Sequence, residues 1–216
     1  SAVQSGDASS TSILLQVRTG ELDLTLVIVV QDGNVWTDER ELQGLEPVGG
    51  TLSIEVDGLQ PDTAYRYVFW AGESGRRSAV GRFRTALGDD SPARKITFAA
   101  TSCLGGVNPE WGSLSHVAGR LPDFFLLLGD TVYADGSYTT AEYRSEWSYA
   151  LAKPSLRDVC AQSSLIATWD DHEVENNWLL GVSVTEEQYA NAVAEFRSAI
   201  PMRVGPGGSG LWRKLS

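Results

Sequence analysis

The sequence predicts a multi-domain α+β protein in which an antiparallel β-sandwich precedes a mainly parallel α/β unit. Short segments of alternating apolar and polar residues, separated by turn signals, fill residues 10–86. Continuous apolar runs separated by helical stretches follow from residue 96 onward. The polar stretch "ALGDDSPARK" marks the change from one pattern to the other. We therefore expect two domains, at residues 1–87 and 88–216.

The first domain is expected to contain at least five short strands, bounded by turns such as Pro61-Asp62. Short strands with no helical period between them are typical of an antiparallel sandwich, which we expect to be self-contained. The segment "LQPDTAYRY" resembles the tyrosine corner of fibronectin type III domains, in which a tyrosine hydroxyl bonds back to the backbone. Ordinary strand aromatics at Tyr65 and Tyr67 fit the same fold. The five expected strands cover residues 12–19, 22–33, 51–59, 64–72 and 79–86.

The second domain contains three apolar runs, which we expect to be strands buried on both faces. They are residues 96–101, 124–129 and 164–169. Four helices are expected between and after these runs. The first covers residues 112–120, the second begins with Thr140 as N-cap, the third begins at Pro154, and the fourth runs from Thr185 to Ser198. Strands that alternate with helices indicate βαβ units and a largely parallel sheet. The Gly/Pro-rich stretch at residues 204–212 is expected to be a loop.

Composition excludes several classes of partner. A formal net charge of −11 argues against electrostatic binding to nucleic acid or to anionic membranes. The sequence has no apolar stretch approaching 18 residues, so we expect no transmembrane segment. It contains neither a start methionine nor a signal peptide, and we expect a processed or trimmed product.

Residues that can bind a metal ion or a phosphate follow each apolar run of the second domain. They are Cys103 after the first, Asp130 and Tyr133 after the second, and Asp171, His172 and Asn176 after the third. Because the carboxyl ends of parallel strands lie along one edge of an α/β sheet, we expect these residues to surround one crevice. The adjacent acids of "WDDHE" repel one another, and cations among them would relieve this repulsion. Taken alone, Asp130 would most often be a turn residue and Cys103 a small buried apolar residue.

The types of these side chains indicate the chemistry. A carboxylate at Asp130 can bridge two metals, as a two-metal hydrolytic site requires. Thiolate and tyrosinate ligands suit a trivalent or soft transition metal, whereas the oxygens of Asp171 and Asn176 suit Ca²⁺ or Mg²⁺. We expect attack of a metal-bound hydroxide on a phosphate ester, with His172 stabilising the phosphoryl group or protonating the leaving oxygen. Glu173 is interpreted as a carboxylate that orients His172.

The motifs "LLLGDTVYAD" and "TWDDHEVENN", with "SC" after the first run, resemble the PhoD-like alkaline phosphatases and phosphodiesterases of the calcineurin-like metallophosphoesterase superfamily. The resemblance covers nearly the whole chain. It implies a fibronectin-III-like sandwich followed by the first half of a metallophosphoesterase domain. It implies a secreted or periplasmic enzyme, exported by a twin-arginine signal, that hydrolyses small phosphate mono- or diesters, with phospholipase-D-like variants included.

The resemblance also implies a cofactor set of one Fe³⁺ and two Ca²⁺ ions. Cys103 and Tyr133 would hold the iron, and Asp130 would bridge iron and calcium. Asp171 and Asn176 would contact metal or phosphate, and which of them binds metal directly stays open.

One departure from the family concerns the remaining ligands, which lie in an aspartate–arginine motif and in later histidine-bearing segments not found before residue 216. We therefore expect the first half of such an enzyme, truncated and inactive alone. The alternative is a non-catalytic extracellular binding or adhesion module with a degenerate phosphatase half, which has no reason to carry iron. The oligomeric state stays open.

The two cysteines of an exported protein would by default form a disulfide, here between Cys103 and Cys160. Cys103, however, follows a strand at the expected metal edge. Cys160 lies near the end of the helix that feeds the next strand, and this helix end is expected at the opposite edge. A strand of five or six residues spans roughly 17–20 Å, and bonded cysteines have Cα atoms within about 7 Å. We therefore expect two free thiols, with Cys160 buried.

Overall fold

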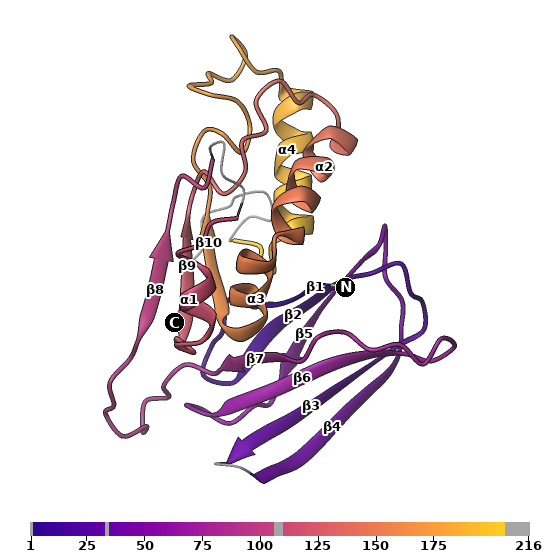
Figure 1. Ribbon diagram of the computed structural model, residues 1–216, viewed down its shortest axis with the longest axis vertical. Coiled ribbons are helices and arrows are strands. Elements are labelled where there is room, and N and C mark those ends of the chain that lie inside the picture. The colour runs from indigo at the N-terminus through magenta and orange to yellow at the C-terminus, as the bar shows by residue number, and fades with distance from the viewer. Residues whose placement is uncertain (1, 33–34, 106–109, 206–216) are drawn as a thin grey trace.

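The computed structural model describes residues 2–32, 35–105 and 110–205, which form two β-sheets and four α-helices (Figure 1). The strands of the larger sheet are β1 (Ala2–Gly6), β2 (Ser12–Arg18), β5 (Thr51–Asp57), β8 (Phe98–Thr101), β9 (Phe124–Leu128) and β10 (Ser164–Thr168). Those of the smaller sheet are β3 (Leu24–Asp32), β4 (Val35–Leu45), β6 (Ala64–Ala71) and β7 (Gly81–Arg84). The sheet orders are β5-β2-β1-β10-β9-β8 and β4-β3-β6-β7. The helices are α1 (Ser115–Ala118), α2 (Thr140–Ala152), α3 (Pro154–Gln162) and α4 (Glu186–Ala199).

All five strands expected in the first 87 residues form, and two further strands, β1 and β4, join them. Strand β1 contains the buried polar residues Gln4 and Ser5, so it lacks the apolar alternation that marks a strand. Strand β4 lies at the edge of its sheet and exposes charged residues such as Arg40 and Glu41. Charges of this kind protect an unpaired strand edge from further pairing. Both strands owe their place to the tertiary structure.

The two sheets of the N-terminal part pack face to face around a core of aliphatic and aromatic side chains. The buried Tyr65 accepts a hydrogen bond on its hydroxyl from the backbone N–H of Gln60 at 2.8 Å. This contact confirms the expected tyrosine corner. Tyr67 packs in the core instead, against Gly81, where a Cβ atom would lie 2.2 Å from the tyrosine ring.

The expectation of a self-contained N-terminal sandwich is wrong. Strand β1 pairs with β2 on one side and, in parallel, with β10 on the other, through Ser5 with Ser164 and Gly6 with Leu165. The backbone N–H of Asp7 continues this ladder to the Leu165 carbonyl at 3.0 Å. One sheet therefore runs from the N-terminal part into the C-terminal part, because β1 supplies the edge onto which β10 adds.

Strands β8, β9 and β10 pair in parallel, as expected. Their burial alternates, however: Phe125 and Leu165 are fully buried, whereas Phe98 is 59% and Leu128 is 49% exposed. The prediction that these strands are buried on both faces is therefore wrong. The physical reason is visible in Figure 1, where α2, α3 and α4 lie on the same side of the three strands.

The helix boundaries follow from local capping, with two corrections. Thr139, rather than Thr140, caps α2: its side chain accepts from the backbone N–H of Glu142, whose carboxylate bonds back to the cap. The first helix covers only four of the nine residues expected, and Gly119 is its C-cap. Pro154 and Thr185 begin α3 and α4 as expected. Most of the loop expected at residues 204–212 lies outside the described residues.

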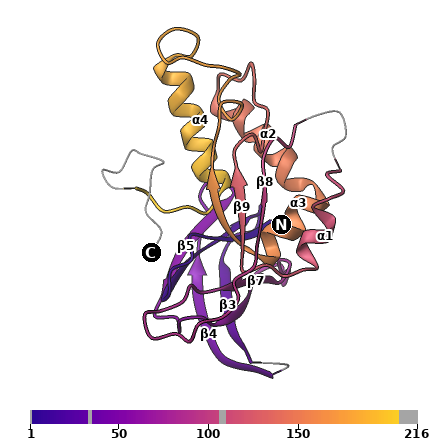
Figure 2. The ribbon, with the colours of Figure 1, turned by 90° about the vertical axis from the view of Figure 1, so that its left-hand side faces the viewer.

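Both cysteines are free, Cys103 exposed and Cys160 buried, as the strand geometry predicts. Burial raises the pKa of the Cys160 thiol to about 12. Among the described residues, none of the helices has the length and apolar character needed to cross a bilayer. Both views place α2 and α4 at the end of the molecule remote from β3 and β4 (Figure 1 and Figure 2).

Candidate metal centre

The loops that follow β8 and β9 are joined at the carboxyl edge of the sheet. The backbone N–H of Cys103 donates to the Gly129 carbonyl at 3.2 Å, and that of Leu104 donates to the Asp130 carbonyl at 2.8 Å. The Cys103 thiol lies 3.5 Å from Oδ2 of Asp130. The structure therefore brings together two of the residues predicted to bind metal.

The turn after β9 has an unusual backbone. Gly129 and Asp130 both have positive φ angles, of 95° and 52°. Gly129 also touches the next loop, since a Cβ atom there would lie 2.6 Å from the Cβ atom of Asp170. This turn carries the Asp130 side chain inward, so that it is only 7% exposed. Its Oδ1 atom is buried and accepts no hydrogen bond from the described residues.

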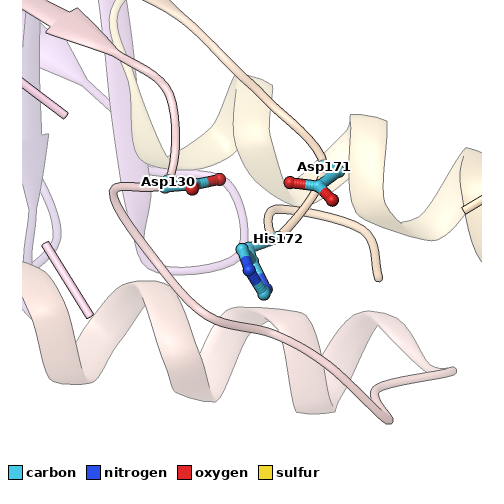
Figure 3. Close-up of side chains that lie close together, drawn as sticks. All are labelled: Asp130, Asp171 and His172. Atoms are coloured by element: carbon cyan, nitrogen blue, oxygen red, sulfur yellow. The ribbon is translucent and has the colours of Figure 1, made fainter. Parts of the chain in front are cut away.

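The loop after β10 brings two further predicted residues to Asp130. Ligand atoms of Asp130, Asp171 and His172 all lie within 4.8 Å of one another. In Figure 3 the carboxylates of Asp130 and Asp171 point toward each other, with His172 beside them. The N–H of Asn177 donates to Asp171 at 2.6 Å and lowers the pKa of that carboxyl. Asp171 is therefore ionised at neutral pH and available to a cation.

His172 is held by Asp135, whose carboxylate oxygens lie 2.8 and 2.9 Å from Nδ1. Because a carboxylate only accepts, the proton of this contact belongs to Nδ1. Burial lowers the pKa of His172, but the hydrogen bond and charge of Asp135, with the charges of Asp130 and Asp171, raise it overall. The Tyr133 ring stacks on the imidazole, with ring centroids 4.0 Å apart.

Tyr133 completes the group of side chains around Asp130. Burial raises the pKa of its hydroxyl, and the negative charges of Asp130 and Cys103 raise it further. Its ring packs on Gly105, where a Cβ atom would lie 2.4 Å away. The neighbouring Asp130 and Cys103 thus disfavour the ionised form of Tyr133. A cation would reverse that effect, and the buried Oδ1 of Asp130 is an acceptor without a donor in the part of the chain that the structure describes, so these residues fit a metal site.

Two residues of the site have roles that the sequence reasoning missed. Asp135, which the sequence pattern alone did not single out, orients His172. The expectation that Glu173 does so is wrong. Both oxygens of Glu173 instead accept backbone N–H groups. Burial raises the pKa of Glu173, although these hydrogen bonds favour its ionised form. The short spacing from Asp130 to Asp135 in "GDTVYAD" is the signal that points to the second acid.

Asn176 lies at the periphery of this group. Its side chain is exposed and accepts from the Asn177 amide at 3.0 Å, and its backbone N–H donates to Asp135 at 2.7 Å. Its contact with metal or phosphate stays a prediction.

Comparison with known proteins gives three consistent matches. The model of the PhoD-like phosphatase family matches residues 98–216. Alkaline phosphatase D of Bacillus subtilis (strain 168) is 28% identical over 146 residues, which cover 59% of this chain and 25% of the relative. A solved structure of PhoD superposes with a TM-score of 0.80 at 23% identity, covering 99% of this chain and 48% of that one.

The chain thus spans about a quarter of the length of the first relative and about half of the second. The superposition shows that the two proteins share a fold over almost all of this chain. Because the family model matches more than half of the 216 residues, this protein belongs to the PhoD-like phosphatase family.

Proposed function

We propose that this protein contributes the metal centre of a phosphoester hydrolase, an alkaline phosphatase or phosphodiesterase acting on small-molecule phosphate esters. The observation that carries the proposal is the convergence of Asp130, Asp171 and His172 at the carboxyl edge of a parallel sheet. Membership of the PhoD-like phosphatase family supports the reaction class independently.

The donor types divide the site into two parts. Cys103 and Tyr133, with Asp130, would hold Fe³⁺, which favours thiolate and phenolate ligands. Asp130 and Asp171 would hold Ca²⁺, which favours carboxylate oxygens, with Asn176 contacting calcium or the phosphate. Asp130 belongs to both parts, in keeping with its position between Cys103 and Asp171.

When bound, the cations supply positive charge that polarises the phosphoryl group and activates a water molecule as nucleophile. The protein itself supplies the acid. Asp135 fixes the proton on Nδ1 of His172 and raises the pKa of the ring, which favours the imidazolium form that also carries a proton on Nε2. His172 then donates the Nε2 proton to the leaving oxygen of the ester. Tyr133, stacked on the imidazole, limits its rotation.

The test uses the full-length protein, purified without chelators. We expect iron and calcium in elemental analysis, and hydrolysis of 4-nitrophenyl phosphate or of bis(4-nitrophenyl) phosphate that is lost on chelation and restored by reloading. The ester that is hydrolysed faster shows whether the enzyme is a monoesterase or a diesterase. Protein that contains neither metal and hydrolyses neither ester would refute the proposal in favour of a non-catalytic binding module.

A further inference from the structure

Glu173 is a fully buried carboxylate that lies beside the candidate metal ligands. Its Oε2 atom accepts from the backbone N–H groups of Asp130 and Asp170, each at 3.0 Å. Its Oε1 atom accepts from the backbone N–H of Thr131 at 2.6 Å. Both oxygens are therefore occupied by the backbone, and the side chain is not placed to act as a ligand.

The backbone around Asp130 is shaped to receive this carboxylate. Positive φ angles at Gly129 and Asp130 turn two successive N–H groups, those of Asp130 and Thr131, toward the same acceptor. Concave arrangements of this kind bind anions. A positive φ angle at a residue other than glycine is unfavourable by itself, and bonds to a charged acceptor offset that cost.

The same carboxylate joins two loops. Two of its donors belong to the loop after β9, which carries Asp130, and the third belongs to the loop after β10, immediately before Asp171. A single buried side chain thus contacts the backbone beside both candidate ligands and helps to set their spacing.

We propose that Glu173 is a positioning residue that holds Asp130 and Asp171 at the separation needed to share cations. This inference rests on the metal centre proposed above. A glutamine cannot replace it, because the amide NH₂ would face one of the three N–H donors. An aspartate keeps the charge, but its side chain is one methylene shorter and cannot reach both loops in the same way.

The test compares Glu173→Gln with a matched control in the full-length protein. Glu195 is also a buried glutamate, 3% exposed, but both its oxygens bond to Arg144 at a contact between α2 and α4. Iron content is measured by elemental analysis, the calcium dissociation constant by calorimetric titration of calcium chloride, and stability by thermal melting. We expect Glu173→Gln to weaken calcium binding by roughly 10–100-fold. Glu195→Gln should lower the melting temperature and leave calcium binding unchanged.

Glu173→Asp provides the same measurement if the glutamine variant does not fold, and it should also bind calcium more weakly than the wild type. Wild-type calcium affinity in the variants of Glu173 would overturn the positioning role alone. An equal loss of affinity in Glu195→Gln would overturn it too, because general destabilisation would then explain the effect. Failure of the wild-type protein to bind iron or calcium would overturn the metal centre itself, and this inference with it.

Discussion

Replacing Asp135 by asparagine should impair His172 as an acid while leaving the fold intact. The variant removes the charge at 2.8 Å from Nδ1 but keeps an oxygen that can accept from the Asn176 N–H. The two side chains are 35% and 19% exposed, so solvent screens the pair and its loss costs only about 1 kcal/mol. Because the hydrogen bond and charge of Asp135 contribute to the raised pKa of His172, that pKa should fall in the variant.

The lower pKa of His172 in the variant can be detected in the pH dependence of activity. In the wild-type protein the pKa of His172 is raised, so the protonated ring persists to higher pH. In the variant, the alkaline limb of the pH–rate profile should therefore shift to lower pH. An alkyl phosphate such as glycerol 2-phosphate needs its leaving oxygen protonated, whereas 4-nitrophenolate leaves without help. We therefore expect kcat to fall by about 10–100-fold for the alkyl ester and much less for the aryl ester.

The control is Asp158→Asn, which changes an exposed aspartate paired with Arg157 on α3. It should leave both pH profiles and both kcat values unchanged. Equal losses of kcat for alkyl and aryl esters in Asp135→Asn, or an alkaline limb that does not move, would refute the role of His172 as an acid oriented by Asp135.

Three further outcomes are expected. Asp130→Ala in the full-length protein should reduce phosphoester hydrolysis by about 10³-fold or more, since it removes the ligand that we propose the metals share; near-normal turnover would exclude a bridging role. A thiol reagent should modify one cysteine, Cys103, in native metal-free protein and both in denatured protein, because Cys160 is buried with a pKa of about 12. Burial alone would raise the pKa of Asp123, but bonds from the Thr97 backbone and an arginine lower it below 3.8. Its carboxylate therefore stabilises the fold above that value and loses this effect as the pH falls through the lowered pKa. Asp123→Asn should accordingly lower the melting temperature at pH 7, and its effect should shrink as the pH falls below 3.8; an effect that does not change with pH would contradict this.

Much of the fold follows from short-range signals in the sequence. Turn residues and apolar alternation located the five expected strands of the first 87 residues, and Thr185 and Pro154 marked two helix starts. The sequence also predicts the principal residues of the candidate site. Cys103, Asp130 and Asp171 each follow a parallel strand, and parallel strands end on one edge, so chain order alone predicts that they meet.

Other features depend on the tertiary structure. Strand β1, with its buried Gln4 and Ser5, has no apolar alternation and is a strand because β2 and β10 flank it. The apolar run of β9 does not reveal that Leu127 is buried and Leu128 exposed, because this depends on which face the helices cover.

For the site, too, some features follow from the sequence and others only from the tertiary structure. The sequence by itself determined which side chains can bind a cation, since ligand chemistry belongs to the residue type and strand ends are local features. Only the tertiary structure decided that Asp135, rather than Glu173, orients His172, and that Glu173 joins the loops after β9 and β10. The physical reason is that a hydrogen bond depends on distances of about 3 Å between groups that are far apart in the chain. Residue order does not encode such distances until the sheet has brought the loops together.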